Sequence, residues 1–256
     1  MRTCLPLLAL LVAGCDLSLT HEPEDYDALD AAERAAADRI FARLQAYDAY
    51  LQAVSGGRHA LGPIATDRNR VDVSAHDLWV VVNIGDDRIH ISVWENLTSD
   101  QRTRFASWFG ESLDAAAARY AVFFYDFMAV HLAGVQTVYA IQGVDWVYSN
   151  RHVFNVERDA ERMGVNYLQE TDPALFNYVW STCGSIRPVG DPRWGSSYNQ
   201  EFYGDNLREL TDPHDPLGYL YFVCRHMEQA ELRRQMYSSS FAAEMEVLEV
   251  YRTGEY

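Results

Sequence analysis

Few side chains of this chain are of types that could do covalent or acid–base chemistry. All 21 basic residues are Arg, so no Lys is present to act as a nucleophile, form a Schiff base or hold a phosphate. The run from Ser181 to Ser185 (Ser-Thr-Cys-Gly-Ser) contains nucleophile types, but no strand precedes it to form a hydrolase elbow, so we expect a helix end or a loop. Asp212, His214 and Asp215 are metal-ligand types, yet two prolines among them indicate a helix-capping turn.

Two later segments resemble the zinc-binding elements of gluzincin-type metallopeptidases. An apolar stretch contains His131-Leu132-Ala133-Gly134-Val135, and 26 residues after His131 a charged stretch begins that reads Glu157-Arg158-Asp159-Ala160-Glu161-Arg162-Met163-Gly164. Enzymes of that family place His-Glu-x-x-His on a central helix, where the two His bind Zn²⁺ and the Glu activates water. A following helix supplies the third ligand. The resemblance implies a zincin-like fold, with His131 and Glu157 at metal-ligand positions and Glu161 in the place of the family's Asp.

The chain departs from this family pattern at two essential positions. Leu132 stands where the general base should be, and Val135 stands where the second His ligand should be. Catalytic zinc normally has three protein ligands, and peptide hydrolysis needs a base beside the water. The resemblance therefore implies a catalytically silent relative with no catalytic residue and no cofactor. The alternative is a divergent zinc-dependent metallopeptidase that uses His131, Glu157 and a third ligand from elsewhere.

A simpler interpretation needs no zincin ancestry. His131 is then one hydrogen-bonded His on a buried helix, and the later helix is exposed, with Glu157–Glu161 and Arg158–Arg162 as a solvated face. The protein is in that case a structural helical lipoprotein. The distance between the His131 and Glu157 side chains separates these interpretations.

The first residues predict export and a lipid anchor. Arg2 is followed by an apolar run from Leu5 to Gly14, about half the length that spans a bilayer, as in a secretory signal peptide. Val12-Ala13-Gly14-Cys15 resembles the lipobox of bacterial lipoproteins, which implies cleavage before Cys15 and acylation of that residue. Several acyl chains on one residue give stable anchoring to a membrane. In the enterobacterial sorting rule, Asp16 after the Cys favours the inner membrane.

Two cysteines remain once Cys4 leaves with the signal and Cys15 is acylated. Cys183 and Cys224 lie about 40 residues apart, and an oxidising periplasm favours a disulfide between them. In the chain-entropy account such a bond stabilises by roughly 3–4 kcal/mol. Two separately buried thiols are the other possibility.

The rest of the chain predicts an α+β fold that is mainly α. Helical periodicity runs from Leu29 to Leu51, and Thr98 with Gln101 forms a capping box for a helix over 99–109. Residues 78–84 and 88–94 predict a small antiparallel β-hairpin, in which alternation places His90 on the wet face. Residues 144–150 are expected as a connection, and further helices are expected over 153–169, 174–182, 217–236 and 240–251.

The most apolar segment, residues 121–141, predicts a buried central helix. Its length would suit a membrane span, but Asp126, His131 and Gln136 are spread through it. A charged side chain at the bilayer centre costs at least about 2.5–3.5 kcal/mol. The core of a globular domain is therefore the better interpretation.

The amino-acid composition limits which kinds of partner the protein can bind. The formal net charge is −16 with 37 acidic residues, which argues against nucleic-acid binding because phosphate contacts need a basic surface. We expect a signal peptide over 1–14, an acidic tether over 15–28 and a single globular domain over 29–256. The prediction is a lipid-anchored cell-envelope protein facing the periplasm, whose partners are the membrane, through its anchor, and an unidentified envelope protein.

Overall fold

The fold is mainly helical. A computed structural model describes residues 25–74, 80–83, 87–150, 153–186 and 216–253. The α-helices are α1 (Ala31–Ser55), α2 (Pro63–Thr66), α3 (Ser99–Phe109), α4 (Leu113–Tyr120), α5 (Ala129–Gln142), α6 (Val144–Asn150), α7 (Val153–Thr171), α8 (Pro173–Ile186), α10 (Pro216–Tyr237) and α11 (Phe241–Thr253). The strands are β1 (Val71–Asp72), β2 (Val80–Asn83) and β3 (Arg88–Ile91).

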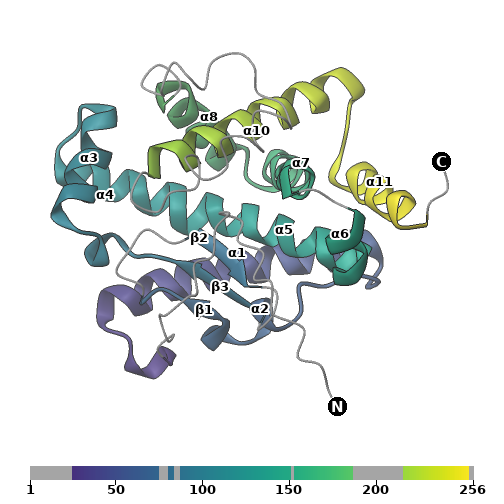
Figure 1. Cartoon of the computed structure of the whole chain (residues 1–256), viewed down its shortest axis with the longest axis horizontal. Helices are drawn as coiled ribbons and strands as arrows, with labels where there is room; N and C mark the ends of the chain where they lie inside the picture. The colour runs from purple at the N-terminus through teal and green to yellow at the C-terminus, as the bar shows by residue number, and fades with distance from the viewer. Residues whose placement is uncertain (1–24, 75–79, 84–86, 151–152, 187–215, 254–256) are drawn as a thin grey trace.

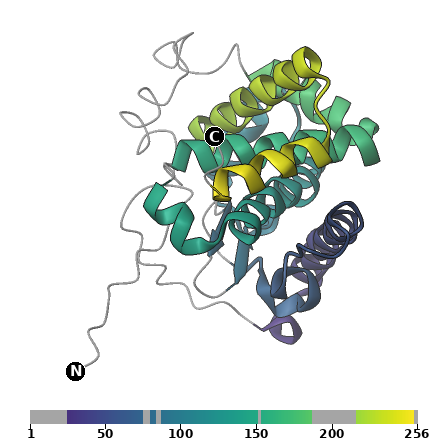
Figure 2. The same cartoon turned by 90° about the vertical axis from the view of Figure 1, so that its right-hand side faces the viewer.

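Helix α5 lies at the centre of the arrangement. The sheet and α1 lie on one side of it, and α7, α8 and α10 lie on the other (Figure 1). Seen from the side, α11 lies on the same side of the molecule as α7, α8 and α10, and α1 lies apart from these helices (Figure 2). The most extensive packing between two helices is that of α5 on α7. This pair therefore forms the core on which the other elements assemble.

Local sequence signals account for where two of the helices begin and end. Asp30 caps α1 in a capping box with Glu33, and α1 ends at Gly56 with a φ of 63°, in the left-handed region that glycine tolerates. Thr98 and Gln101 form the predicted capping box of α3, which ends before Gly110 in the same conformation. Both predicted helices are confirmed.

The small sheet has the strand order β1-β3-β2. Strands β2 and β3 pair antiparallel, as predicted, with Val81 opposite His90. Strand β1 adds a parallel edge that the sequence did not predict, with Asp72 opposite His90. Because β1 lies beside β3, the side chain of Asp72 lies next to that of His90, and the prediction of an exposed His90 is wrong. His90 is 2% exposed.

The central apolar segment is a continuous helical stretch with an unusual middle. α4 passes into a π-helix, η4 (Ala121–Met128), which passes into α5. By length and composition Leu113–Gln142 could cross a membrane, yet 89% of its apolar window is buried inside the protein. The prediction of a buried central helix is confirmed.

An ion-pair network joins η4 to the N-terminal helix. Asp126 of η4 accepts hydrogen bonds from Arg39 (Nε–Oδ1, 2.9 Å) and Arg43 (Nε–Oδ1, 3.1 Å) of α1. Arg43 also donates to Asp172, just before α8. Asp126, whose charge argues against a membrane span, therefore belongs to a network that links η4, α1 and the start of α8.

Two boundaries differ from the predictions. Residues 144–150 form helix α6 instead of a connection, since Gly143, at a φ of 83°, ends α5 and lets a new helix start at once. The predicted tether ends earlier than residue 28. Tyr26–Ala28 is a 3-10 turn, and Tyr26 is hydrogen-bonded through its backbone to Asn69 and through its hydroxyl to Asp38.

Candidate functional site

The structure brings together the two residues placed at metal-ligand positions, and adds a third. His131 on α5 lies between Glu157 and Glu161 on α7. Its Nε2 is 2.9 Å from Glu157 Oε2, and its Nδ1 is 2.6 Å from Glu161 Oε2. All three side chains have an exposed fraction of 0%. The site is a buried acid–His–acid bridge between the two central helices, and we call it the His131 bridge.

A glycine lets the two helices approach closely enough for this bridge. A Cβ atom built on Gly134 would lie 2.4 Å from the backbone oxygen of Ala160, well inside van der Waals contact. Gly134 is one turn after His131, and Ala160 adjoins Glu161. Because no larger residue fits at position 134, the glycine sets the distance over which His131 reaches both carboxylates.

The electrostatics of the bridge favour a charged imidazole. Burial alone would lower the pKa of His131, but the charges and hydrogen bonds of Glu157 and Glu161 outweigh burial and raise this pKa from 6.5 to about 10. At neutral pH the ring is therefore an imidazolium that donates one N–H to each carboxylate. Burial raises the pKa of Glu161, and the charge of Glu157 acts in the same direction, against the bond to His131.

The described residues do not fit a zinc centre. No group of three or more His, Cys, Asp or Glu in the described ranges is arranged to hold a metal ion. The two carboxylates bond to different nitrogens of one ring and therefore do not converge on a common point. Leu132 and Val135, in the positions of the family's base and second His, are both fully buried in the apolar core.

The bridge leaves two oxygens without a partner. Oε1 of Glu157 and Oε1 of Glu161 are buried and accept no hydrogen bond from the residues that the structure describes. Buried polar atoms are nearly always paired, so such an atom in a native fold weakens the site that contains it. The two bonds that His131 makes to the carboxylates are thus strong, but the hydrogen bonding of the two carboxylates is incomplete.

The two glutamates of the charged face predicted on the later helix are buried. Glu157 and Glu161 are not solvated, and the interpretation of that stretch as an exposed charged helix is wrong. The signal lay in the spacing: Glu157, Glu161, Gly164 and Leu168 recur at intervals of four, three and four, so they share one helical face. Glycine and leucine on that face pointed to packing against a neighbour.

Sequence reasoning missed a second buried acid–His pair, in the sheet. Asp72 Oδ2 is 2.6 Å from His90 Nδ1, and Asp72 Oδ1 accepts from both the backbone N–H (3.0 Å) and the hydroxyl (2.7 Å) of Ser74. Burial would raise the pKa of Asp72, but the bonds to His90 and Ser74 hold it well below its usual range. Only the unexpected strand β1 brings these residues together.

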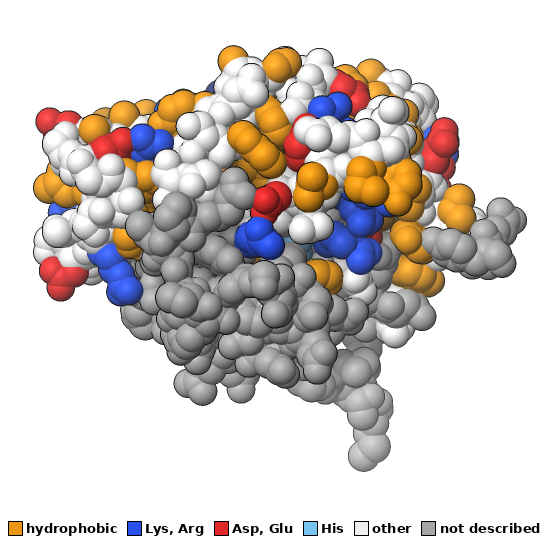
Figure 3. All heavy atoms as spheres, turned by 90° about the horizontal axis from the view of Figure 1, so that it is seen from above, with side chains coloured by type: hydrophobic (Ala, Val, Ile, Leu, Met, Phe, Trp, Pro, Cys, Tyr) orange, Lys and Arg blue, Asp and Glu red, His pale blue; other side chains and the backbone are white. Residues whose placement is uncertain are grey.

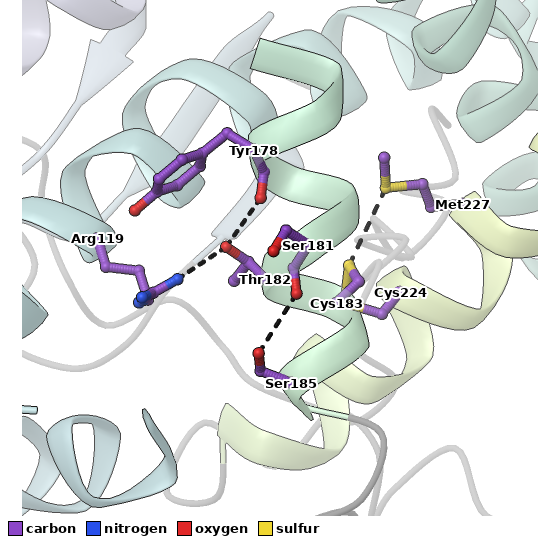
Figure 4. The surroundings of a disulfide bond; sticks show 8 residues. All are labelled: Arg119, Tyr178, Ser181, Thr182, Cys183, Ser185, Cys224 and Met227. Carbon is purple, nitrogen blue, oxygen red and sulfur yellow. Dashed lines mark hydrogen bonds between the residues drawn. A yellow bond between two sulfur atoms is a disulfide. The ribbon is translucent and has the colours of Figure 1, made fainter. Parts of the chain in front are cut away.

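The predicted disulfide is present. Cys183 of α8 is bonded to Cys224 of α10, and the Met227 sulfur lies 4.0 Å from Cys183 Sγ (Figure 4). The segment Ser181–Ser185 lies in the last turns of α8, where the hydroxyl of Ser185 donates to the Ser181 carbonyl. These residues therefore form a helix end, as predicted. Cys15 and the predicted turn at Asp212, His214 and Asp215 lie outside the described residues.

Comparisons with known proteins add no identity. Neither the protein-family models, nor the curated proteins, nor the solved structures give a match to this chain. The functional argument therefore depends on the residues and their geometry.

Proposed function

We propose that this protein is a lipid-anchored lipoprotein of a bacterial cell envelope, with a domain that binds or scaffolds without catalysis. The observation that carries the second half is the His131 bridge. Both ring nitrogens of His131 are engaged by carboxylates, so neither is available to a metal or a substrate. The three side chains are also closed to solvent.

The arrangement supports a zincin-like origin for this helix pair. In order along the chain, an antiparallel strand pair precedes a central helix carrying His131, and a following helix carries Glu157. Zincin sites commonly hold the metal-bound His through a carboxylate on its other nitrogen, which is the place of Glu161 here. On this proposal the imidazolium has taken over the charge that a metal would otherwise supply between the helices.

Metal analysis tests the absence of catalysis by zinc. The purified full chain is expected to contain zinc far below one equivalent, and the double variant His131→Ala, Glu157→Ala is expected to contain no less. Stoichiometric zinc that is lost in this variant would overturn the proposal in favour of a divergent metallopeptidase. The matched control is His59→Ala, which removes a His bonded to Glu249 outside the bridge.

The anchor is tested at Cys15. We expect Cys15→Ser to abolish incorporation of labelled fatty acid and to release the protein from the membrane fraction, because the lipobox resemblance makes this residue the acylated one. Membrane association that is unchanged in the variant contradicts the anchor. Asp16 favours the inner membrane, which separation of inner and outer membranes tests directly.

A further inference from the structure

A cleft lies between α7 and α10, on the side of α7 next to the His131 bridge. Its volume is about 340 Å³, within the size range of small-molecule pockets. Its buried members are Phe154, 8% exposed, and His226, 1% exposed, whose rings lie 5.1 Å apart. It is lined by one face of each helix, since its residues recur at helical spacing on both.

The polar lining of the cleft is cationic. Arg158 and Arg162 of α7 and Arg233 of α10 all line it. Asp159 accepts from Arg158 Nε (3.1 Å) and Arg162 Nη1 (3.0 Å), and Glu244 accepts from Arg233 Nε (3.0 Å). Among the described residues, these three guanidinium groups thus share the two carboxylates of Asp159 and Glu244. The Nη groups of Arg158 and Arg233 are not used in these pairs.

The buried histidine of the cleft adds no charge. Burial lowers the pKa of His226 well below its ordinary value, and the positive charges of His131, Arg158 and Arg162 lower it further. His226 is therefore neutral at pH 7. The positive charges that line the cleft therefore come from the arginines.

The rim of the cleft is apolar and open. Leu232, Met236 and Tyr237 are 45%, 72% and 67% exposed, and they are three of the seven most exposed large apolar side chains in the described residues. The view from above shows basic and apolar side chains next to one another on this face (Figure 3). Exposed apolar side chains gathered beside a pocket are typical of a binding site.

We propose that this cleft binds a small amphiphilic monoanion, a carboxylate on an unbranched apolar chain. The carboxylate accepts from the Nη groups of Arg158 and Arg233, as arginine favours. The apolar chain lies over Leu232 and Met236, where the flexible Met side chain adapts to its shape. This inference rests on the proposed function for one point, that the domain binds a ligand instead of hydrolysing one.

Calorimetric titration of the full chain tests this ligand class. The protein is placed in nanodiscs of zwitterionic lipid, with empty nanodiscs as the blank, and titrated with octanoate. Saturable binding of one octanoate is expected. Acetate lacks the chain, inorganic phosphate lacks the chain and carries more charge, and octyltrimethylammonium has the opposite charge. Each is expected to bind at least about tenfold more weakly, the size of one charged hydrogen bond.

Two pairs of variants separate the two halves of the site. Arg158→Gln should weaken octanoate binding about tenfold, since Asp159 keeps its bond to Arg162 and the fold is preserved. Arg234→Gln, beside the cleft but paired with Glu231, should leave binding unchanged. Met236→Ala should weaken binding by roughly threefold to tenfold, and Leu113→Ala, an exposed residue of α4, should not.

Three outcomes overturn the inference: no saturable octanoate binding, equal binding of octyltrimethylammonium, or equal losses in Arg158→Gln and Arg234→Gln. Each leaves the metal analysis untouched, so failure of this ligand class is distinguishable from failure of the proposed function. Stoichiometric zinc at His131 would instead overturn the proposed function, whatever octanoate does.

Discussion

His131 and His90 are both buried beside carboxylates, but the two sites are built differently. His131 lies between two glutamates of one helix, and burial raises the pKa of Glu161. His90 has a single carboxylate partner, Asp72, whose pKa is held well below its usual range. The first site has more acid than base, and the second has one of each.

The difference lies in how fully each carboxylate is satisfied. Ser74 donates twice to Asp72, so both oxygens of that carboxylate have partners. Glu157 and Glu161 each keep one buried oxygen with none. A carboxylate with complete hydrogen bonding keeps much of its stabilisation if its His is removed, whereas two incompletely bonded carboxylates depend on theirs. The His131 bridge should therefore be the more fragile site when one member is lost.

The largest expected effect is the loss of the imidazolium from the His131 bridge. His131→Ala leaves two carboxylates buried without a counter-charge, and should lower the free energy of unfolding by about 3–5 kcal/mol. His90→Ala, in which Asp72 keeps its Ser74 bonds, should lower it by about 1–3 kcal/mol. Urea denaturation of both variants measures the difference. An equal or larger loss for His90→Ala would contradict the comparison.

The next effect concerns the spacing that the bridge needs. Gly134→Ala drives a methyl group against the Ala160 carbonyl and should lower the free energy of unfolding by about 1–3 kcal/mol. Gly164→Ala is the matched control on α7: its Cβ would lie 3.6 Å from Val130 Cγ1, an ordinary contact. There the better helix propensity of Ala should stabilise by up to about 1 kcal/mol. Similar losses in both variants would show that the close approach at Gly134 is not what matters.

The two sites should weaken at opposite ends of the pH scale. The folded pKa of His131 is raised, so its contribution is complete below pH 6.5 and is lost as the pH rises from there through about 10. Glu161, also raised, declines in the same direction above its ordinary pKa of 4.5. The Asp72 pKa is lowered, so its contribution is present above pH 3.8 and is lost on acidification.

Denaturation across pH measures these contributions. The alkaline slope of the free energy of unfolding should flatten when His131, Glu157 and Glu161 are replaced together by Leu, Met and Met, and the acid slope should flatten in Asp72→Asn. Each variant serves as the control for the other. An alkaline slope that persists unchanged without His131 would assign it to other groups.

The smallest effect is expected when the whole bridge is replaced. His131→Leu combined with Glu157→Met and Glu161→Met removes all three polar groups together and fills the space with apolar atoms. Replacing a complete buried ion cluster is often neutral or stabilising, so stability should lie within about 1 kcal/mol of the wild type or above it. A loss as large as that of His131→Ala alone would show that the bridge contributes stability of its own.

The local rules of the sequence were enough to predict much of the fold. Helical periodicity predicted α1, a capping box predicted α3, and the apolar run predicted the central helix. The burial of Glu157 and His90 was not predicted, because it depends on which distant elements cover them. Glu157 meets His131 of α5, and the partner of His90, Asp72, comes from a two-residue strand that is too short to show a pattern.

The candidate site was predictable only as a pairing. The resemblance placed His131 and Glu157 at metal-ligand positions, and in the structure their side chains are in direct contact. That Glu161 would take the other ring nitrogen followed from neither spacing nor composition. It depends on the close approach at Gly134, which is visible only once α5 and α7 are packed.

The π-helix η4 makes the length of the central segment as important as its composition. Removing one residue from an α-helix turns the preceding part by about 100° and shifts it by about 1.5 Å relative to the following part. A one-residue deletion between Asp126 and His131, for example of Phe127 or Met128, would therefore turn Asp126 away from α1 while His131 stays against α7. Homologues that keep both the contact of Asp126 with α1 and the contact of His131 with α7 should align between these two residues without a gap, however much their loops vary in length.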